Sequence, residues 1–142
     1  MTPIPAPAYL QHVGTAVPRH AVHEALLAYA RSRLRTGPER ELLDRVARRS
    51  GIAQRYAVQP PGRTEAGEID AAGFYRPGAF PTTAVRMALF ERQALPLALH
   101  AVQALAPPDE LAALLARVTH LVVGTSSGFM APGLDVQLVD AL

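Results

Sequence analysis

The sequence predicts an α/β fold built on a parallel sheet, and three observations lead to this prediction. The 142 residues are 49% hydrophobic and 18% charged, a balance typical of a globular domain with a core. Apolar residues recur at helical spacing in several segments. Between these segments lie short apolar runs that end in Gly, Thr or Pro, as strands do. Alternation of the two kinds of segment is typical of the α/β class.

The first part of the chain is expected to hold two strands and two helices. Residues 8–18 are interpreted as a first strand that stops at a proline. Helices are predicted over residues 23–35, ended by Gly37–Pro38, and over residues 39–51. Residues 52–58 then have the pattern of a short strand.

The second part begins with a Pro/Gly-rich connection over residues 59–81. It is long for a loop in a compact domain, so we expect it to be functional or to hold a short helix. A helix is predicted over residues 82–105, buried along its second half and kinked or split by Pro96. Another helix follows over residues 107–118. Residues 119–125 form a continuous apolar run, the pattern of a strand buried on both faces of a parallel sheet.

The composition excludes several kinds of chemistry. Cys, Trp, Lys and Asn are absent, so all 14 basic residues are Arg, a usage that suggests a GC-rich bacterial genome. These residues can therefore supply no thiolate nucleophile, no Schiff-base lysine, no disulfide and no cysteine-ligated zinc, and no metal site is expected. A net charge of +2 does not indicate a nucleic-acid partner. No apolar run is long enough for a membrane span and no secretory signal is visible, so the expected location is the cytoplasm.

Residues 124–128, GTSSG, fit the G-x-S-x-G pattern of a serine nucleophile elbow, with Ser126 as the nucleophile. An elbow needs a helix directly after the serine, but Pro132 and Gly133 delay the next helical pattern to residues 134–142. All five histidines precede Ser126, whereas the triad of that fold places its histidine last. The alternative interpretation is a sharp Gly/Ser turn at the end of a parallel strand, where α/β folds place ligands.

Three segments, in this order, resemble the type III polyketide synthases, the chalcone and stilbene synthase family. They are YLQHVGTAVP at 9–18, LLDRVARRSGIAQRYAV at 42–58 and THLVVGTSSGFMAPGLDVQL at 119–138. The resemblance extends from about Tyr9 to Leu142. It implies the thiolase-like fold, in which layered helices enclose mixed sheets. Residues 1–142 would be the N-terminal portion of that fold, incomplete by themselves.

The resemblance also implies a binding site for coenzyme A. In that family, cations on the basic helix bind the phosphates of coenzyme A at the mouth of a tunnel, and Arg45 and Arg49 match two of them. Leu42 stands where the family often has a third cation. From the residues themselves, Arg45, Arg48 and Arg49 form a cluster that could bind phosphate or could simply be a solvated helix face. Arg48 has no counterpart in the resemblance, so its role stays open.

Further residues are implied for the substrate cavity. Ser126 and Ser127 match a Thr-Ser pair that lines the starter cavity in the family. Met130, Ala131 and Pro132 lie in the segment that crosses toward the partner's cavity in the family dimer. Many relatives have Met at the position of Ala131, so Met130 is an adjacent substitute. Apolar packing is the alternative role for Met130.

The family's catalytic residues are a Cys-His-Asn set that follows the PGLD segment, and the chain reaches Leu142 before that region. We therefore expect the N-terminal part of an acyltransferase that condenses an acyl-CoA starter with malonyl-CoA, with CoA thioesters as substrates and no bound cofactor. It would be inactive alone and would form a homodimer in the intact protein. One alternative is a non-catalytic split subunit or binding module that pairs with a cysteine-bearing partner. The other is a serine hydrolase that uses Ser126.

Overall fold

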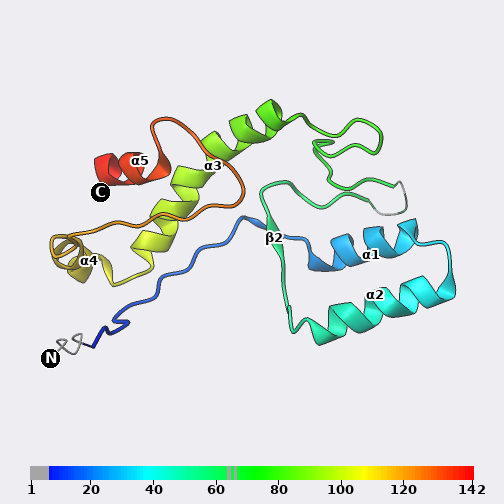
Figure 1. Cartoon of the computed structure of the whole chain (residues 1–142), viewed down its shortest axis with the longest axis horizontal. Coiled ribbons are helices and arrows are strands. Elements are labelled where there is room, and N and C mark those ends of the chain that lie inside the picture. Colours follow the sequence, from blue (N-terminus) through cyan, green and yellow to red (C-terminus); the bar gives the residue numbers. More distant parts are fainter. Residues whose placement is uncertain (1–6, 64, 66) are drawn as a thin grey trace, which may run out of the picture. The chain divides into compact units, whose positions relative to one another are not determined.

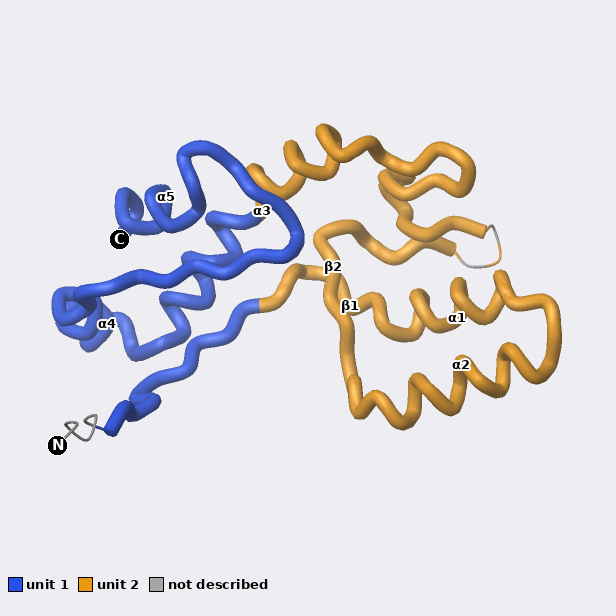
Figure 2. Tube along the Cα trace, in the orientation of Figure 1, with its two compact units in different colours: residues 1–16, 94–142 blue, residues 17–93 orange. Residues whose placement is uncertain are grey.

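A computed structural model describes residues 7–63, 65 and 67–142. Within these residues the chain forms five helices and one two-stranded sheet, so the α/β class is confirmed as a mixture of helices and strands (Figure 1). The predicted parallel sheet is wrong for the described residues, because their one sheet is antiparallel. The chain divides into two compact units (Figure 2). Unit 1 comprises Met1–Ala16 and Ala94–Leu142, and unit 2 comprises Val17–Gln93. None of the helices in the described ranges combines the length and the apolar character that crossing a membrane requires.

Unit 2 begins with a helical hairpin made of α1, His23–Arg33, and α2, Gly37–Arg49. Both helices were predicted, within two residues at each end. An ion pair between the Arg31 guanidinium and the Asp44 carboxylate connects the two helices. The hairpin therefore has a specific electrostatic contact in addition to its apolar face.

The start of α2 corrects one prediction, because Gly37 and Pro38 open this helix and do not close the preceding one. Thr36 is the N-cap: its Oγ1 accepts a hydrogen bond from the Glu39 N–H at 3.4 Å, and Glu39 Oε2 accepts one from the Thr36 N–H at 3.0 Å. This is a capping box. Proline is favoured in the first turn of a helix because its missing N–H has no partner there anyway.

The sheet of unit 2 is smaller than the sequence predicts. β1, His20–Ala21, pairs antiparallel with β2, Tyr56–Ala57, in the register His20 with Ala57. The strand predicted over residues 52–58 is thus reduced to two residues, and the strand predicted over residues 8–18 does not form. Apolar runs can form ladders only where a neighbouring segment supplies backbone partners.

The longest helix, α3, runs over Thr83–Gln103 and includes Pro96 without being split. Thr82 caps it, since the Val85 N–H donates to Thr82 Oγ1 at 3.3 Å. The predicted burial of its second half is wrong, because no residue of α3 is fully buried. Proline removes one helical hydrogen bond, and the helix continues through that loss.

Unit 1 contains the end of α3, then α4, Pro108–Leu115, and α5, Leu134–Ala141. Both short helices were predicted. The buried strand predicted over residues 119–125 is wrong: the segment has no ladder partner in the described part of the chain, and Val122 is 92% exposed. A strand buried on both faces needs neighbours and covering helices, and the described residues provide neither.

Close backbone packing in unit 1 occurs at Gly14. A Cβ added there would lie 2.9 Å from the Leu105 nitrogen and 3.0 Å from the Ala104 carbonyl carbon. No ordinary side chain fits so close to backbone atoms. The extended segment before α1 therefore lies directly against the C-terminal end of α3, and glycine is required at this contact.

The interior of the described structure is small. Leu138 of α5, 4% exposed, is the one hydrophobic side chain in the described ranges that is fully buried. Large apolar side chains are open to solvent, including Val122 at 92% and Phe129 at 78%. Apolar patches of this kind are typical of surfaces that bind another molecule.

This surface leads to a first prediction. The purified chain should bind a hydrophobic fluorescent dye under native conditions, because its apolar side chains are accessible without unfolding. The double substitution V122T/F129S should lower the dye fluorescence, whereas S126A in the same loop should leave it unchanged. Dye fluorescence equal to that of a well-packed globular control would contradict the exposure.

The capping box leads to a second prediction. Thr36→Ala removes the acceptor for the Glu39 N–H and should lower the free energy of unfolding by about 1 kcal/mol. Thr36→Ser keeps the hydroxyl and should retain most of the stability. Denaturant titration of the three proteins, followed by circular dichroism, measures the difference.

The same box predicts a direction for the titration of Glu39. Hydrogen bonds from the Thr36 and Arg35 N–H groups lower the pKa of its carboxyl below the ordinary value of 4.5. The stabilisation is therefore complete above the unfolded-state pKa and is lost as the pH falls through the lower folded-state pKa. An NMR titration should show this depression, and it should shrink in Thr36→Ala. An unchanged titration in that variant would argue against the box.

Candidate functional site

The arginine cluster, Arg45, Arg48 and Arg49, lies on the last turns of α2 and is exposed. Residues three and four apart are neighbours on a helix, with Cβ atoms about 6 Å apart, so Arg45 is adjacent to both of the others. The C-terminus of a helix carries a partial negative charge that stabilises cations there. Gly51, with φ of 65°, ends the helix in the left-handed conformation, as the sequence predicts.

The three arginines of the cluster have no acidic partner within the described ranges. Elsewhere in unit 2, Arg31 pairs with Asp44 and Arg63 pairs with Glu68 at 3.4 Å. Glu41 stands one turn before Arg45 but makes no ion pair with it. The cluster therefore presents unpaired positive charge, a property that suits an anionic ligand with several oxygens.

The cluster has an apolar neighbour on the same helix. Leu42 and Val46 are exposed, whereas Leu43 and Ala47 are half-buried. Only part of the apolar face of α2 is therefore covered, and the exposed part borders the arginines.

The serine loop lies in unit 1. Ser126 and Ser127 are exposed, and the Ser127 N–H donates to Thr125 Oγ1 at 3.3 Å. Residues 128–133 are not helical, so the helix that a nucleophile elbow requires is missing directly after the serine. No histidine of the described residues is hydrogen-bonded to Ser126; the nearby His120 Nδ1 instead contacts Thr119 Oγ1 at 2.9 Å. This arrangement gives no support to a serine hydrolase.

The segment Met130–Pro132 is tied to α5 of the same unit. Gln137 Nε2 donates to Met130 Sδ at 2.8 Å and to the Pro132 carbonyl at 3.0 Å. Met130 is half-buried, whereas Ala131 and Pro132 are exposed and joined by a cis peptide bond. Gln137 thus holds the segment whose role in a dimer remains a prediction.

The predicted site residues consequently form two groups. Arg45 and Arg49 lie together on one helix of unit 2. The serines and the Met130–Pro132 segment lie together before α5 in unit 1. Each group consists of residues that are close in the sequence. Of the two groups, the arginine pair has the clearer chemistry, because its unpaired positive charge suits an anionic ligand.

The long connection over residues 59–81 is folded around the buried side chain of Asp70. Asp70 is 5% exposed, and its two carboxylate oxygens accept hydrogen bonds from the Phe74 N–H at 2.8 Å and the Tyr75 N–H at 2.7 Å. Two backbone contacts close the base: the Ala71 N–H donates to the Pro60 carbonyl at 3.0 Å, and Pro61 forms a bridge with Asp70. The described residues of the connection therefore form a loop held by specific hydrogen bonds. The short helix that was one expectation stays a prediction, because residues 64 and 66 lie outside the described ranges.

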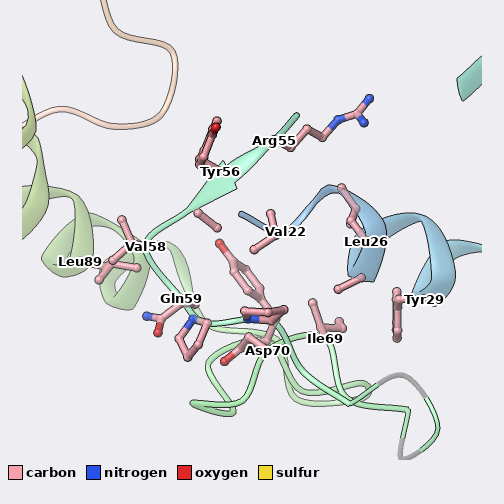
Figure 3. Close-up of a pocket in the computed structure, with 15 residues that line it drawn as sticks. Val22, Leu26, Tyr29, Arg55, Tyr56, Val58, Gln59, Ile69, Asp70 and Leu89 are labelled. Atoms are coloured by element: carbon pink, nitrogen blue, oxygen red, sulfur yellow. The ribbon is translucent and has the colours of Figure 1, made fainter. Parts of the chain in front are cut away.

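Beside this loop is a mainly apolar hollow of about 410 Å³ (Figure 3). It is bordered by α1, by β2 and the residues after it, by the loop, and by Leu89 of α3. Figure 3 shows Leu26 on one side and Leu89 on the other, with Ile69 and Asp70 below. The hollow shows that the loop leaves apolar surface of unit 2 accessible.

Sequence reasoning missed the polar contact between α1 and β2. Arg55 Nη1 lies 2.5 Å from Nδ1 of His23, which is buried at the start of α1. A guanidinium can only donate, so Nδ1 accepts this hydrogen bond. The residues are 32 positions apart, and nothing in the local pattern brings them together. Asp70 was missed for a different reason: a DAAG turn was visible in the sequence, but its burial was not.

Comparison with known proteins gives no relative for this chain. No protein-family model matches it, and neither a curated protein nor a solved structure matches it. Any function must therefore be argued from its own residues and from the motif resemblance.

A third prediction follows from the Asp70 carboxylate. Asp70→Ala leaves two N–H groups without acceptors and should destabilise the loop by about 1–3 kcal/mol. Amide hydrogen exchange at Phe74 and Tyr75 should accelerate accordingly. Asp140→Ala, at an exposed carboxylate on α5, is the control and should leave both amides unchanged. Equal protection of the two amides in Asp70→Ala would show that the carboxylate does not hold the loop.

Proposed function

We propose that the chain is the N-terminal portion of a type III polyketide synthase of thiolase-like fold, and that Arg45 and Arg49 bind the phosphates of CoA thioesters. The observation that carries the proposal is the unpaired positive charge of these two exposed guanidiniums on successive turns of α2. The order of the three motifs supports it independently, because the arginines fall at the cations of the resembled helix.

The physical chemistry of the pair suits this ligand. Coenzyme A carries a diphosphate and a 3′-phosphate, and each phosphate offers oxygens to the forked donors of arginine. The arginines make no internal hydrogen bonds in the described ranges, so binding need not break existing contacts. Leu42 occupies the position where the resembled family often has a third cation. The proposed phosphate binding therefore depends on Arg45 and Arg49.

The reaction would need residues besides these 142. Condensation of an acyl group with malonyl-CoA requires a thiolate to hold the acyl group as a thioester, and the chain contains no Cys. In the proposed enzyme, this portion holds the CoA phosphates, which fixes the position of the thioester relative to a nucleophile supplied elsewhere. Ser126 and Ser127 would shape the starter cavity, and Met130, Ala131 and Pro132 would meet a second copy. Because acyl-CoA and malonyl-CoA are the proposed substrates, the cytoplasm is the proposed location.

Binding of coenzyme A by the 142-residue chain tests the proposal, and it is our fourth prediction. The chain should bind coenzyme A, measured by isothermal titration calorimetry at low ionic strength. R45Q/R49Q should weaken binding by about 10- to 100-fold, because charge-assisted hydrogen bonds contribute about 1.5–3 kcal/mol. Affinity should also fall with added salt, as expected for exposed charges.

The matched control is R19Q/R92Q, which removes the same charge from two exposed arginines of the same unit that lie off α2. It should bind coenzyme A nearly as well as the parent chain. An equal loss of affinity for coenzyme A in the two double variants would show that only net charge matters. Absence of any binding by the parent chain would refute the proposal.

A further inference from the structure

A second hollow of unit 2 opens beside the arginine cluster. It is a shallow hollow of about 260 Å³ that lies where α1 faces the C-terminal end of α2. Its lining is largely apolar and includes His23, Leu27, Ala47, Ile52, Ala53 and Arg48. An apolar hollow whose edge carries an unpaired arginine suits a flat ring attached to an anion.

Arg48 connects this hollow with the phosphate-binding pair. It lines the hollow and is the i+3 neighbour of Arg45, which in turn neighbours Arg49 at i+4. Arg48 and Arg49 therefore both lie one turn after Arg45, and the three guanidiniums form one cluster with Arg48 on the side of the hollow. The planar guanidinium of Arg48 can stack on a base at the edge of the hollow, as arginine does in nucleotide recognition.

His23 supplies a polar group to the same hollow. Its Nδ1 accepts a hydrogen bond from Arg55, so the neutral ring carries its proton on Nε2. Nε2 has no hydrogen-bond partner within the described ranges, and it is not among buried polar atoms left unsatisfied there, so it keeps a small exposed area although His23 as a whole is only 8% exposed. A ring with an accessible N–H in an otherwise apolar lining can donate to a ring nitrogen of a purine.

We propose that this hollow binds the adenine base of coenzyme A, with Arg48 stacked on the base and the phosphates directed toward Arg45 and Arg49. The inference rests on the proposed function, since it concerns the same ligand. It assigns to Arg48 a role that neither the motif resemblance nor the helix pattern gives it.

The test compares two small ligands on the whole 142-residue chain. Adenosine 3′,5′-bisphosphate carries base and phosphates, whereas 1-deoxyribose 3,5-bisphosphate carries the same phosphates without the base. The adenosine compound should bind about tenfold or more tightly than the abasic one, as expected for stacking of one base. Calorimetry or competition against a fluorescent CoA analogue measures both affinities.

Two variants locate the base. Ala53→Leu, at an exposed position, fills the hollow with a larger side chain. Arg48→Lys keeps the charge but removes the plane that stacks. Each should reduce the advantage of the adenosine compound by several-fold and leave the affinity for the abasic compound unchanged. Circular dichroism establishes that the variants fold. Because Arg48→Lys changes only an exposed side chain, this variant tests the site even if Ala53→Leu is unstable.

The outcomes separate this inference from the proposed function. Equal affinity for the two ligands, or an advantage that both variants retain, overturns the adenine site while phosphate binding by Arg45 and Arg49 stands. Absence of binding for either ligand, and for coenzyme A itself, overturns both. Loss of the adenosine advantage in both variants, with abasic binding intact, supports the site.

Discussion

The ion pair between Arg31 and Asp44 determines which charges of α2 remain available. Asp44 stands four residues before Arg48, the spacing at which an acid and a base on one helix attract each other. In the structure, Asp44 is instead engaged by α1, so Arg48 has no acidic partner there. This one contact therefore connects the two helices and leaves the arginine cluster without this acidic neighbour. The phosphate binding proposed for this surface depends on this pairing, because Asp44 is paired with Arg31 and not with an arginine of the cluster.

The arginine cluster depends only on the local structure of one helix. Arg45, Arg48 and Arg49 belong to one helix, whose start is fixed by the Thr36–Glu39 capping box and whose end is fixed by Gly51. None of this depends on a large buried core, and the described structure has only a small one. The phosphate site that we propose thus depends on α2 alone, whereas large apolar side chains elsewhere in the described structure are exposed.

How much could be predicted from the sequence depended on whether each feature is local. All five helices were foreseen, because periodicity, caps and prolines act within a few residues. The strands were poorly foreseen: residues 8–18 and 119–125 have the composition of strands, but a ladder needs a partner that composition cannot supply. The same division holds for the site. The arginine cluster could be predicted from helical spacing. The contact of His23 with Arg55 and the burial of Asp70 could not, because they depend on folding across the chain.

The arginine cluster has a further consequence for how ligand binding would respond to pH and ionic strength. The guanidinium has no neutral form within the range of biological pH, so the charge of this surface does not vary with acidity. The second ionisation of a phosphate monoester occurs near about pH 6, so it is the ligand whose charge changes between mildly acidic and neutral conditions. For the phosphate contacts proposed for Arg45 and Arg49, acid sensitivity would therefore originate in the small molecule, and ionic strength would be the variable to which these arginines respond.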